Sequence, residues 1–482
     1  MTRYLIHSLT FLIAIFISTV QGFSKIILPD IISSNMVLQQ DTKIKFWGRL
    51  DKTSNFKIHL SWNDSVIHVK ATNKGTWVAY FHTPKAGGPH TITLNDDSDK
   101  IILNDILIGD VWLCSGQSNM EMPIKGYPGQ QPVYKSLQTI ASAREDIPIR
   151  MFTVRKEYSI SPKKEECKGV WEKNNSLTVS NFSATAYFFG LQLYHSLNVP
   201  IGLINASWGG SAIESWMDIS YLKMYLDIEP IKAKDIININ HPEHKASLLY
   251  NAMLYPLQSV KIKGMIWYQG ERNRFNPSQY ENLMVDFVHN MRNLFADKKL
   301  PFYFVQIAPF PYPDTPGKGV LLREAQEKAS KRLKDCGMAV ITDKGDSLCI
   351  HPMDKEVVGQ RLAYLALQQT YLKQGINAKS PELAYIEVKG SDLFLTFENT
   401  GVGITSLGKS LNLFEVAGND SIFYHANAQI ISPDKIKVST PKVKSPIFIR
   451  YAFKDYVRGE LFGCNGIPVS SFRANIYSNI KK

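Results

Sequence analysis

Five short apolar segments, each running into polar or glycine-containing residues, constrain the fold of this chain more than any other feature. They are ILIGDVWLC (106–114), PIGLINASW (200–208), KGMIWYQG (263–270), PFYFVQIAPF (301–310) and GMAVITD (337–343). Continuous apolar runs of this length suit strands that are buried on both faces of a parallel sheet. Amphipathic helices separate them, and one of these has Asn276 as its N-cap and Pro277 in its first turn. We therefore predict an α/β domain over residues 106–378, with its active site at the carboxyl ends of the strands.

The segments on either side of this domain have a different pattern. Residues 23–105 and 379–482 contain short β-branched or aromatic runs, such as TWVAYFHT and DLFLTFEN, separated by turn-forming residues. This pattern predicts a β-sandwich-like N-terminal domain over 23–105 and a C-terminal β region over 379–482. The sequence leaves open whether these two β regions pack against each other.

The N-terminus is typical of a secretory signal peptide. Arg3 precedes an apolar stretch over 11–17, and small residues precede Phe23, which predicts a signal peptide over 1–22. An uncleaved membrane anchor is the alternative. No other segment has 18 uninterrupted apolar residues, so we predict an exported protein, periplasmic or extracellular, without a stable membrane anchor after cleavage.

Composition excludes several other classes of protein. The chain is 44% hydrophobic and 20% charged, as a folded protein is, and its formal net charge of +12 is spread without a basic run. Nucleic-acid binding usually requires a clustered basic patch, so we predict no nucleic-acid partner. Five cysteines are too few for a disulfide scaffold and show no metal-ligand spacing, although pairing of Cys336 with Cys349 stays open. The sequence does not indicate an oligomeric state.

Polar residues follow three of the predicted strands. They are the block SGQSN (115–119), the pair Gly209-Gly210 and the block QGERN (269–273). A hydroxyl near glycine backbone and side-chain amides can form a nucleophile with an oxyanion hole. The alternatives are a serine that caps a helix, a tight turn and a solvated loop.

His351 follows the fifth apolar segment and directly precedes Pro352, which we place in the first turn of the next helix. It is the one histidine at a strand-to-helix junction of the α/β region. The positive end of the helix dipole disfavours imidazolium, so a histidine there stays neutral and can act as a general base. A capping or solvated histidine is the alternative.

Taken in order, these blocks carry a family resemblance. The motifs are GDVWLCSGQSNMEMPI, PIGLINASWGGSAIESW, IKGMIWYQGERN and IHPMDKEVVGQRLA. They resemble the SGNH (GDSL-like) hydrolase superfamily and, more closely, the sialate O-acetylesterase family of carbohydrate esterases. The resemblance spans nearly all of the chain after the signal peptide.

This resemblance implies a fold and a set of catalytic residues. The fold is an SGNH-type three-layer domain with a mostly parallel sheet, flanked by β-sandwich-like regions. Ser118 is then the nucleophile and His351 its general base. The oxyanion hole takes the backbone N–H of Ser118, a glycine N–H and a side-chain amide. The candidates are Gly209 or Gly210 for the glycine, and Gln269 or Asn273 for the amide, with Gln269 preferred because it lies nearer the strand end.

Two positions depart from the family pattern. Arg272 stands where the family usually has a serine, and we place Arg272 and the neighbouring Glu271 at the substrate-binding site, although a plain surface arginine is the alternative. The superfamily's Asp-x-x-His is missing, because Leu348 lies three residues before His351. Either Asp346 or a backbone carbonyl must then orient the imidazole, and the carbonyl is slightly preferred.

The resemblance implies an exported serine esterase that removes O-acetyl groups from sialic acids, with an O-acetylated sugar as its partner and no metal or cofactor. One alternative is an esterase of acetyl-xylan or another polysaccharide. A second is a glycan-binding protein whose active site has decayed. Which sugar hydroxyl is deacetylated stays open.

Overall fold

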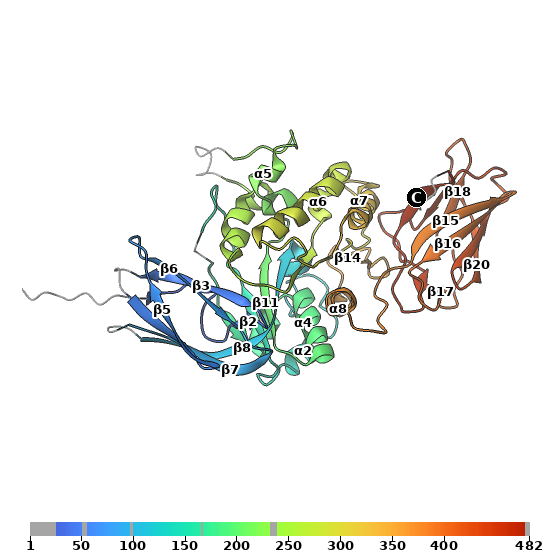
Figure 1. Cartoon of the computed structure of the whole chain (residues 1–482). Helices are drawn as coiled ribbons and strands as arrows, with labels where there is room; N and C mark the ends of the chain where they lie inside the picture. Colours follow the sequence, from blue (N-terminus) through green and yellow to red (C-terminus); the bar gives the residue numbers. More distant parts are fainter. Residues whose placement is uncertain (1–25, 51–54, 97–99, 165–166, 232–238, 478–482) are drawn as a thin grey trace, which may run out of the picture.

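Three regions lie in a row in the computed structural model, with N-terminal strands at one end, an α/β region in the middle and C-terminal strands at the other end (Figure 1). The two β regions are therefore separated by the α/β region and do not pack against each other. The structure describes residues 26–50, 55–96, 100–164, 167–231 and 239–477. The predicted signal peptide (1–22) lies outside the described residues.

The α/β region is built on a mostly parallel sheet, as the apolar segments predict. In spatial order its strands are β10 (Trp171–Lys173), β9 (Ile149–Thr153), β11 (Ile201–Ser207), β8 (Lys100–Gly116), β12 (Gly264–Tyr268), β13 (Phe302–Val305) and β14 (Cys336–Ala339). Neighbouring strands pair in parallel from β9 to β14, and only the edge strand β10 is antiparallel. All five predicted strands are present, while β9 and β10 were not predicted.

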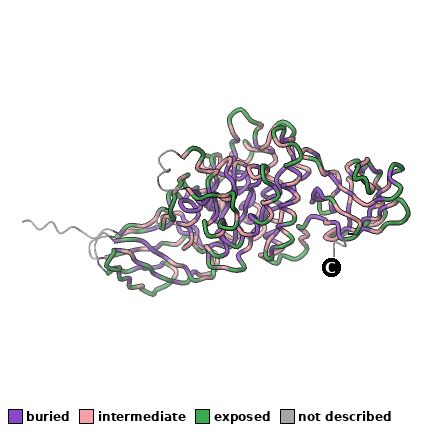
Figure 2. The backbone as a smooth tube through the Cα atoms, turned by 90° about the horizontal axis from the view of Figure 1, so that it is seen from above, coloured by how far each residue is buried: buried purple, intermediate pink, exposed green. Residues whose placement is uncertain are grey.

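Helices cover both faces of this sheet. Along β8, Val111 and Leu113 belong to one hydrophobic cluster, whereas Trp112 and Cys114 belong to another, because successive side chains of a strand point to opposite faces. The helices α6 (Pro277–Leu294) and α7 (Lys318–Arg332) pack on the first face, and α4 (Ala184–Leu197) and α8 (Lys355–Gln369) on the second. The buried residues accordingly concentrate in the middle region (Figure 2).

The two predicted helix starts have different outcomes. Helix α6 begins at Pro277, as predicted, and buries one face, but the side chain of Asn276 makes no capping hydrogen bond. The buried side chains of that face are Tyr280, Leu283, Met284, Phe287, Val288 and Met291. Helix α8 begins at Lys355 and not at Pro352, because the side chain of Asp354 accepts a hydrogen bond from the N–H of Val357 and so makes Asp354 the N-cap.

The N-terminal strands form two layers, and one of these continues into the central sheet. The first layer holds β1 (Ile26–Ile27), β3 (Lys43–Leu50) and β6 (Thr76–His82). The second holds β2 (Val37–Gln39), β4 (Asn55–Leu60), β5 (Asn63–Lys70) and β7 (Gly87–Asn95), and it joins β8. The domain boundary predicted between residues 105 and 106 therefore falls inside β8, which serves both regions. The division of the chain into domains stays a prediction.

The C-terminal strands form separate antiparallel sheets. One holds β15 (Glu382–Lys389), β16 (Asp392–Glu398), β21 (Lys435–Ser439) and β20 (Asn427–Ser432); another holds β19 (Tyr424–His425), β18 (Phe414–Ala417), β22 (Phe448–Tyr451) and β24 (Phe472–Asn475). A short pair joins β17 (Ile404–Thr405) to β23 (Phe462–Gly463). Buried Arg323 of α7 anchors this region, because its guanidinium donates to the carbonyl oxygens of Lys454 and Asp455.

Further short helices are α2 (Ser136–Ala141), α3 (Ser176–Asn181) and α5 (Ile219–Leu222).

All five cysteines are free thiols, so Cys336 and Cys349 are not paired. Among the described residues, no helix has both the length and the apolar character needed to cross a bilayer.

The close approach of β8 to the start of β11 gives a testable prediction. A Cβ at Gly109 would lie 2.0 Å from the carbonyl oxygen of Pro200, so Gly109→Ala must push the two segments apart. We expect a loss of about 1–3 kcal/mol in the free energy of unfolding, measured as a lower midpoint in urea or on heating. Gly87→Ala is the matched control, because a Cβ at Gly87 meets nothing nearer than 4.0 Å. Equal midpoints for the two variants would contradict the prediction.

Candidate active site

The first strand-end block turns sharply at Gly116 and brings Ser118 to the start of the short helix α1 (Ser118–Glu121). Gly116 has a φ of +147°, and a Cβ there would lie 2.1 Å from the carbonyl oxygen of Tyr268. A side chain would therefore clash with β12, and glycine is required. The N–H of Gln117 donates to the same Tyr268 oxygen at 3.0 Å, which fixes Ser118 at the carboxyl edge of the sheet.

The side chain of His351 contacts Ser118. Its Nε2 lies 2.8 Å from Ser118 Oγ, and its Nδ1 lies 2.7 Å from the side-chain oxygen of Gln130. An amide oxygen can only accept, so Nδ1 carries the proton and Nε2 presents its lone pair to the serine hydroxyl. This is the tautomer that a general base requires. The ring of Tyr127 meets the imidazole edge-on, with centroids 5.5 Å apart, and limits its rotation.

Asp346 does not contact His351. Its carboxylate accepts hydrogen bonds from the N–H groups of Leu348 at 2.7 Å and Cys349 at 3.0 Å, and the bond from Leu348 is the main reason that its pKa is lowered. Asp346 therefore stabilises the loop before the histidine. Neither orienting group considered from the sequence, Asp346 or a backbone carbonyl, is at Nδ1, because Gln130 occupies that position. Gln130 lies 221 residues from His351 along the chain, and no spacing rule indicates it.

The imidazole of His351 is neutral at neutral pH, as the sequence predicts, but mainly for another reason. Burial and, to a smaller extent, the nearby positive charge of Lys355 together lower the pKa of His351 to about 4. The sequence argument relied on the dipole of a helix that begins at Pro352. Because α8 begins at Lys355, the histidine lies before the N-cap and not in the first turn.

A buried polar cluster lies behind the serine and the histidine. Asn119, next to the nucleophile, donates from Nδ2 to Glu271 Oε1 at 2.6 Å and to the carbonyl oxygen of Ile350 at 3.2 Å, and its Oδ1 accepts from Lys355 Nζ. One amide thus connects the residue after Ser118 to the residue before His351. Sequence reasoning missed Asn119 and Lys355, although both belong to the quoted motifs, because their burial cannot be read from those motifs.

Burial dominates the titration of this cluster. It lowers the pKa of Lys355 to about 7, with Glu271 acting in the opposite direction, and it raises the pKa of Glu271. Glu271 is 2% exposed, and within the described part of the chain its Oε2 has no hydrogen-bond partner. The prediction that Glu271 contacts substrate is therefore wrong for this structure, since its carboxylate points into the interior.

The glycine pair lies against the nucleophile. A Cβ at Gly209 would lie 3.5 Å from Ser118 Cβ, so its backbone borders the serine. The Gly209 N–H donates to Oε2 of Glu121, and Oε1 of the same carboxylate pairs with Lys156 at 2.7 Å. A carboxylate oxygen on this N–H marks a position beside Ser118 where a negatively charged oxygen fits. Over the described residues, no hydrogen bond from the N–H of Ser118 or of Gly210 is found.

Of the two candidate amides, Asn273 is the one with a free donor. Gln269 is completely buried, and its Nε2 donates to the carbonyl oxygen of Ser211 at 3.0 Å and to Asn273 Oδ1 at 2.7 Å. Both of its amide hydrogens are used, so the preference for Gln269 is not supported. Half-buried Asn273 donates to Glu214 Oε2 at 2.9 Å, which leaves its second Nδ2 hydrogen available. Distance from the strand end was therefore a poor guide.

Arg272 lies beside these donors. It is half-buried, its guanidinium carbon lies 5.2 Å from the ring centroid of Phe275, and it forms no ion pair with any described residue. Its positive charge lowers the pKa of Glu214 and of His244, in each case as a smaller effect than burial. Because no described carboxylate lies within ion-pair distance of it, Arg272 can receive an anionic group from outside the protein.

One group of side chains among the described residues has metal-ligand chemistry. The ligand atoms of His241, Glu243 and His244 all lie within 4.8 Å of one another. His241 Nδ1 is 3.0 Å from Glu243 Oε1, and this contact satisfies both groups without an ion. The prediction that the reaction needs no metal stays a prediction.

Together these residues have the parts required for acyl transfer: a serine hydroxyl, a neutral imidazole that accepts its proton, and N–H donors beside the serine. Known proteins with similar sequences and structures agree with this chemistry. The family model for "Carbohydrate esterase, sialic acid-specific acetylesterase" matches residues 108–368.

The similarity to individual proteins extends beyond that segment. The sialate O-acetylesterase of Mus musculus is 27% identical over 432 residues, which cover 76% of this chain and 78% of that protein. The sialate O-acetylesterase of Homo sapiens is 28% identical over 397 residues, which cover 74% of this chain and 73% of that protein. The crystal structure of a novel carbohydrate acetylesterase from Xanthomonas citri matches with a TM-score of 0.85 at 32% identity, covering 94% of this chain and all of that one. Since the family model covers more than half of its residues, this chain belongs to the sialic acid-specific acetylesterase family of carbohydrate esterases.

Proposed function

We propose that this protein removes O-acetyl groups from sialic acids through a catalytic serine, Ser118, and a general base, His351, oriented by Gln130. The observation that carries the proposal is the chain of two short contacts, 2.8 Å from Ser118 Oγ to Nε2 and 2.7 Å from Nδ1 to the Gln130 oxygen. Family membership supports the reaction class, and this chain of contacts supports the roles of the residues.

The first half of the reaction transfers the acetyl group to the enzyme. His351 Nε2 takes the proton of the Ser118 hydroxyl while Oγ attacks the acetyl carbonyl carbon, forming a tetrahedral intermediate with a negatively charged oxygen. The bond to the sugar oxygen then breaks. The imidazolium returns its proton to that oxygen, so the sugar leaves as a neutral alcohol and Ser118 is left acetylated.

The second half regenerates the serine. Water enters beside the acetyl-serine, gives a proton to His351 Nε2 and attacks the ester carbon. The second tetrahedral intermediate breaks at the bond to Ser118 Oγ, which recovers its proton from the imidazolium as acetic acid leaves and loses its own proton to solvent to become acetate. Gln130 keeps Nδ1 protonated in both halves, although a neutral amide stabilises imidazolium less than a carboxylate would.

We assign the oxyanion hole to the N–H groups of Ser118 and Gly209 and to Nδ2 of Asn273. Gly209 is preferred to Gly210 because its N–H already binds a carboxylate oxygen, that of Glu121, beside the nucleophile. The carbonyl oxygen of the substrate would replace the Glu121 oxygen there. Asn273 is held in place by the N–H of Ile213, which donates to its Oδ1 at 3.0 Å.

The positive charge of Arg272 favours the binding of an acidic sugar at this site. Sialic acids carry a carboxylate, and a guanidinium without an ion pair can bind it with two parallel hydrogen bonds.

We also propose that the middle region is an SGNH-type three-layer domain, and that the protein is exported to the periplasm or the cell exterior.

The proposal predicts which substrate is hydrolysed and by which serine. The wild-type protein should release acetate from 9-O-acetylated sialic acid, and Ser118→Ala should lower the rate by about 10³-fold or more because the nucleophile is lost. Ser445→Ala, at an exposed position of the C-terminal region, is the control and should keep full activity. Release from acetyl-xylan and not from the sialic acid would reject the sialate assignment. Release that survives in Ser118→Ala would reject the mechanism.

Gln130 provides a second test. Gln130→Ala removes the acceptor at Nδ1, so the imidazole loses its fixed tautomer, and kcat should fall by about tenfold. Gln130→Glu places a carboxylate there, which stabilises imidazolium and raises the pKa of His351, so activity should return with its acid limb at a higher pH. The exposed Gln138→Ala serves as control. An unchanged kcat in Gln130→Ala would show that another group orients the histidine.

The lowered pKa of His351 predicts an unusual pH profile. The base works only when neutral, so kcat/KM should hold through pH 5 and fall as the pH drops through about 4. Lys355 is protonated in that range, because its own pKa is about 7. Lys355→Met removes the positive charge and should move the acid limb to higher pH, whereas the exposed Lys373→Met should not. An acid limb near pH 6.5 in the wild type would contradict the argument.

A further inference from the structure

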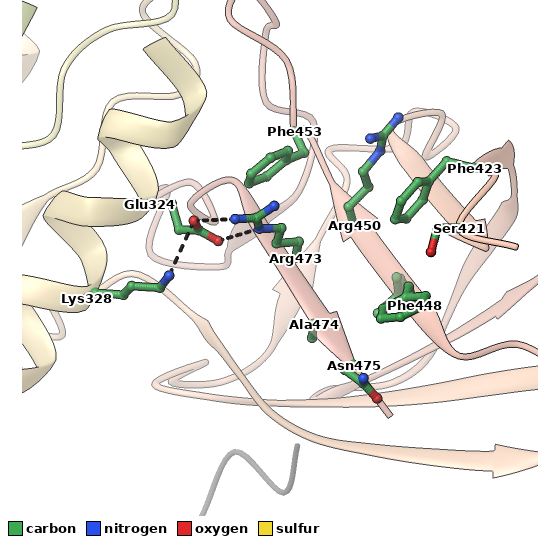
Figure 3. Close-up of a pocket in the computed structure, with 11 residues that line it drawn as sticks. Glu324, Lys328, Ser421, Phe423, Phe448, Arg450, Phe453, Arg473, Ala474 and Asn475 are labelled. Atoms are coloured by element: carbon green, nitrogen blue, oxygen red, sulfur yellow. Dashed lines mark hydrogen bonds and ion pairs between the residues drawn. The ribbon is translucent and has the colours of Figure 1, made fainter. Parts of the chain in front are cut away.

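A cavity of about 520 Å³ lies where helix α7 meets the C-terminal sheet of β22 and β24 (Figure 3). None of the residues assigned to the reaction lines it. Its lining residues are Glu324, Lys328, Ser421, Phe423, Phe448, Ile449, Arg450, Phe453, Arg473, Ala474 and Asn475. The volume is large enough for a sugar residue.

Two arginines stand side by side in this cavity. Arg450 of β22 and Arg473 of β24 are directly opposite each other in the antiparallel register. Like charges in that arrangement repel, so the pair needs anions to offset it. Each has one carboxylate partner: Glu415 accepts from Arg450 Nε at 2.7 Å, and Glu324 accepts from Arg473 Nε and Nη2 at 2.8 Å and 3.0 Å.

These partners leave donors and positive charge unused. A guanidinium has five N–H donors, and within the described chain Arg450 uses one and Arg473 two in these ion pairs. The lining contains a third cation, Lys328, and a single carboxylate, Glu324. The cavity therefore has a net positive charge even when Glu415, just outside it, is counted.

Aromatic rings fix the two guanidinium groups and supply an apolar wall. The guanidinium carbon of Arg450 lies 4.0 Å from the ring centroid of Phe423, and that of Arg473 lies 5.1 Å from the centroid of Phe453. Phe448 is half-buried in the same lining. Figure 3 shows Phe448 on β22, the strand that also carries Arg450. Fixed guanidinium donors beside an apolar face match a ligand with a carboxylate on a ring that has C–H faces.

We propose that this cavity is an accessory site for a carboxylate-bearing sugar residue of a glycan, with the carboxylate held between Arg450 and Arg473 and the ring against Phe448. The site is separate from Ser118 and binds without hydrolysis. It does not depend on which ester the enzyme cleaves, so the proposed deacetylation and this binding site can fail independently of each other.

The test measures binding to the full-length Ser118→Ala protein, which cannot turn over substrate, by calorimetric titration. The probes are an unacetylated oligosaccharide ending in sialic acid, one ending in glucuronic acid, and the neutral analogue of each in which the carboxylate is reduced to an alcohol. We expect saturable binding of the acidic probes and a loss of about tenfold or more in affinity for the neutral ones.

Variants assign this binding to the cavity. Adding Arg450→Gln should weaken the binding of the acidic probes about tenfold. The double change Arg450→Gln and Glu415→Gln, which keeps the net charge of the protein, should weaken their binding by the same factor. The exposed Lys435→Gln, which removes one positive charge elsewhere in the C-terminal region, should leave the affinity unchanged. Arg272→Gln should affect only binding beside Ser118 and should leave intact the binding that Arg450→Gln weakens. Unfolding midpoints of each variant verify that it is folded.

Several results would overturn the proposal. These are the absence of saturable binding by the parent protein, equal affinity for acidic and neutral probes, and unchanged affinity in a folded Arg450→Gln variant. An equal loss of affinity in Lys435→Gln would show that the effect depends only on the overall charge of the protein. A loss of affinity in Arg272→Gln alone would assign the binding to the catalytic site. Saturable binding of inorganic phosphate in place of the acidic sugars would also reject it.

Discussion

The parallel hydrogen bonding of β8 to β11 and β12 is the constraint on which the site depends. It aligns Ser115 with Ala206 on one side and Trp267 on the other, so three strands end at the same edge of the sheet. The polar blocks that follow these strands are therefore brought together at that edge. A slip of one residue would turn every side chain of β8 to the opposite face, and the tight contact of Gly116 with Tyr268 opposes it.

Behind that edge, a buried acid and a buried base hold the site together at an electrostatic cost. Glu271 and Lys355 are both inside the protein, where charges are costly unless they are paired and hydrogen-bonded. Asn119 supplies both kinds of hydrogen bond, and in doing so joins the nucleophile block to the histidine loop. The cluster thus contributes more to geometry than to stability, and it helps to keep His351 neutral.

The features of the fold and the site that depend on local sequence pattern could be predicted, whereas contacts between residues distant in the sequence could not. Apolar runs located the strands of the central sheet, and the strand-end motifs brought Ser118 and His351 forward as partners, which lie 2.8 Å apart. Gln130 could not be predicted, because it reaches His351 from a distant loop. The choice of Gln269 over Asn273 failed because the outcome depends on which amide hydrogens are already used, and that is decided by packing.

The continuity of β8 has a consequence for how this protein can be divided. Its 17 residues begin in the N-terminal strands and end two residues before Ser118. Removing the N-terminal region would therefore cut a backbone that carries the nucleophile and would expose a long unpaired strand edge. The C-terminal strands, in contrast, form sheets of their own and contact the α/β region through the side chain of Arg323 and through backbone hydrogen bonds such as that from Gly459 to Thr342. The N-terminal strands therefore cannot be separated from the active site without breaking β8, whereas the C-terminal region shares no strand with the central sheet.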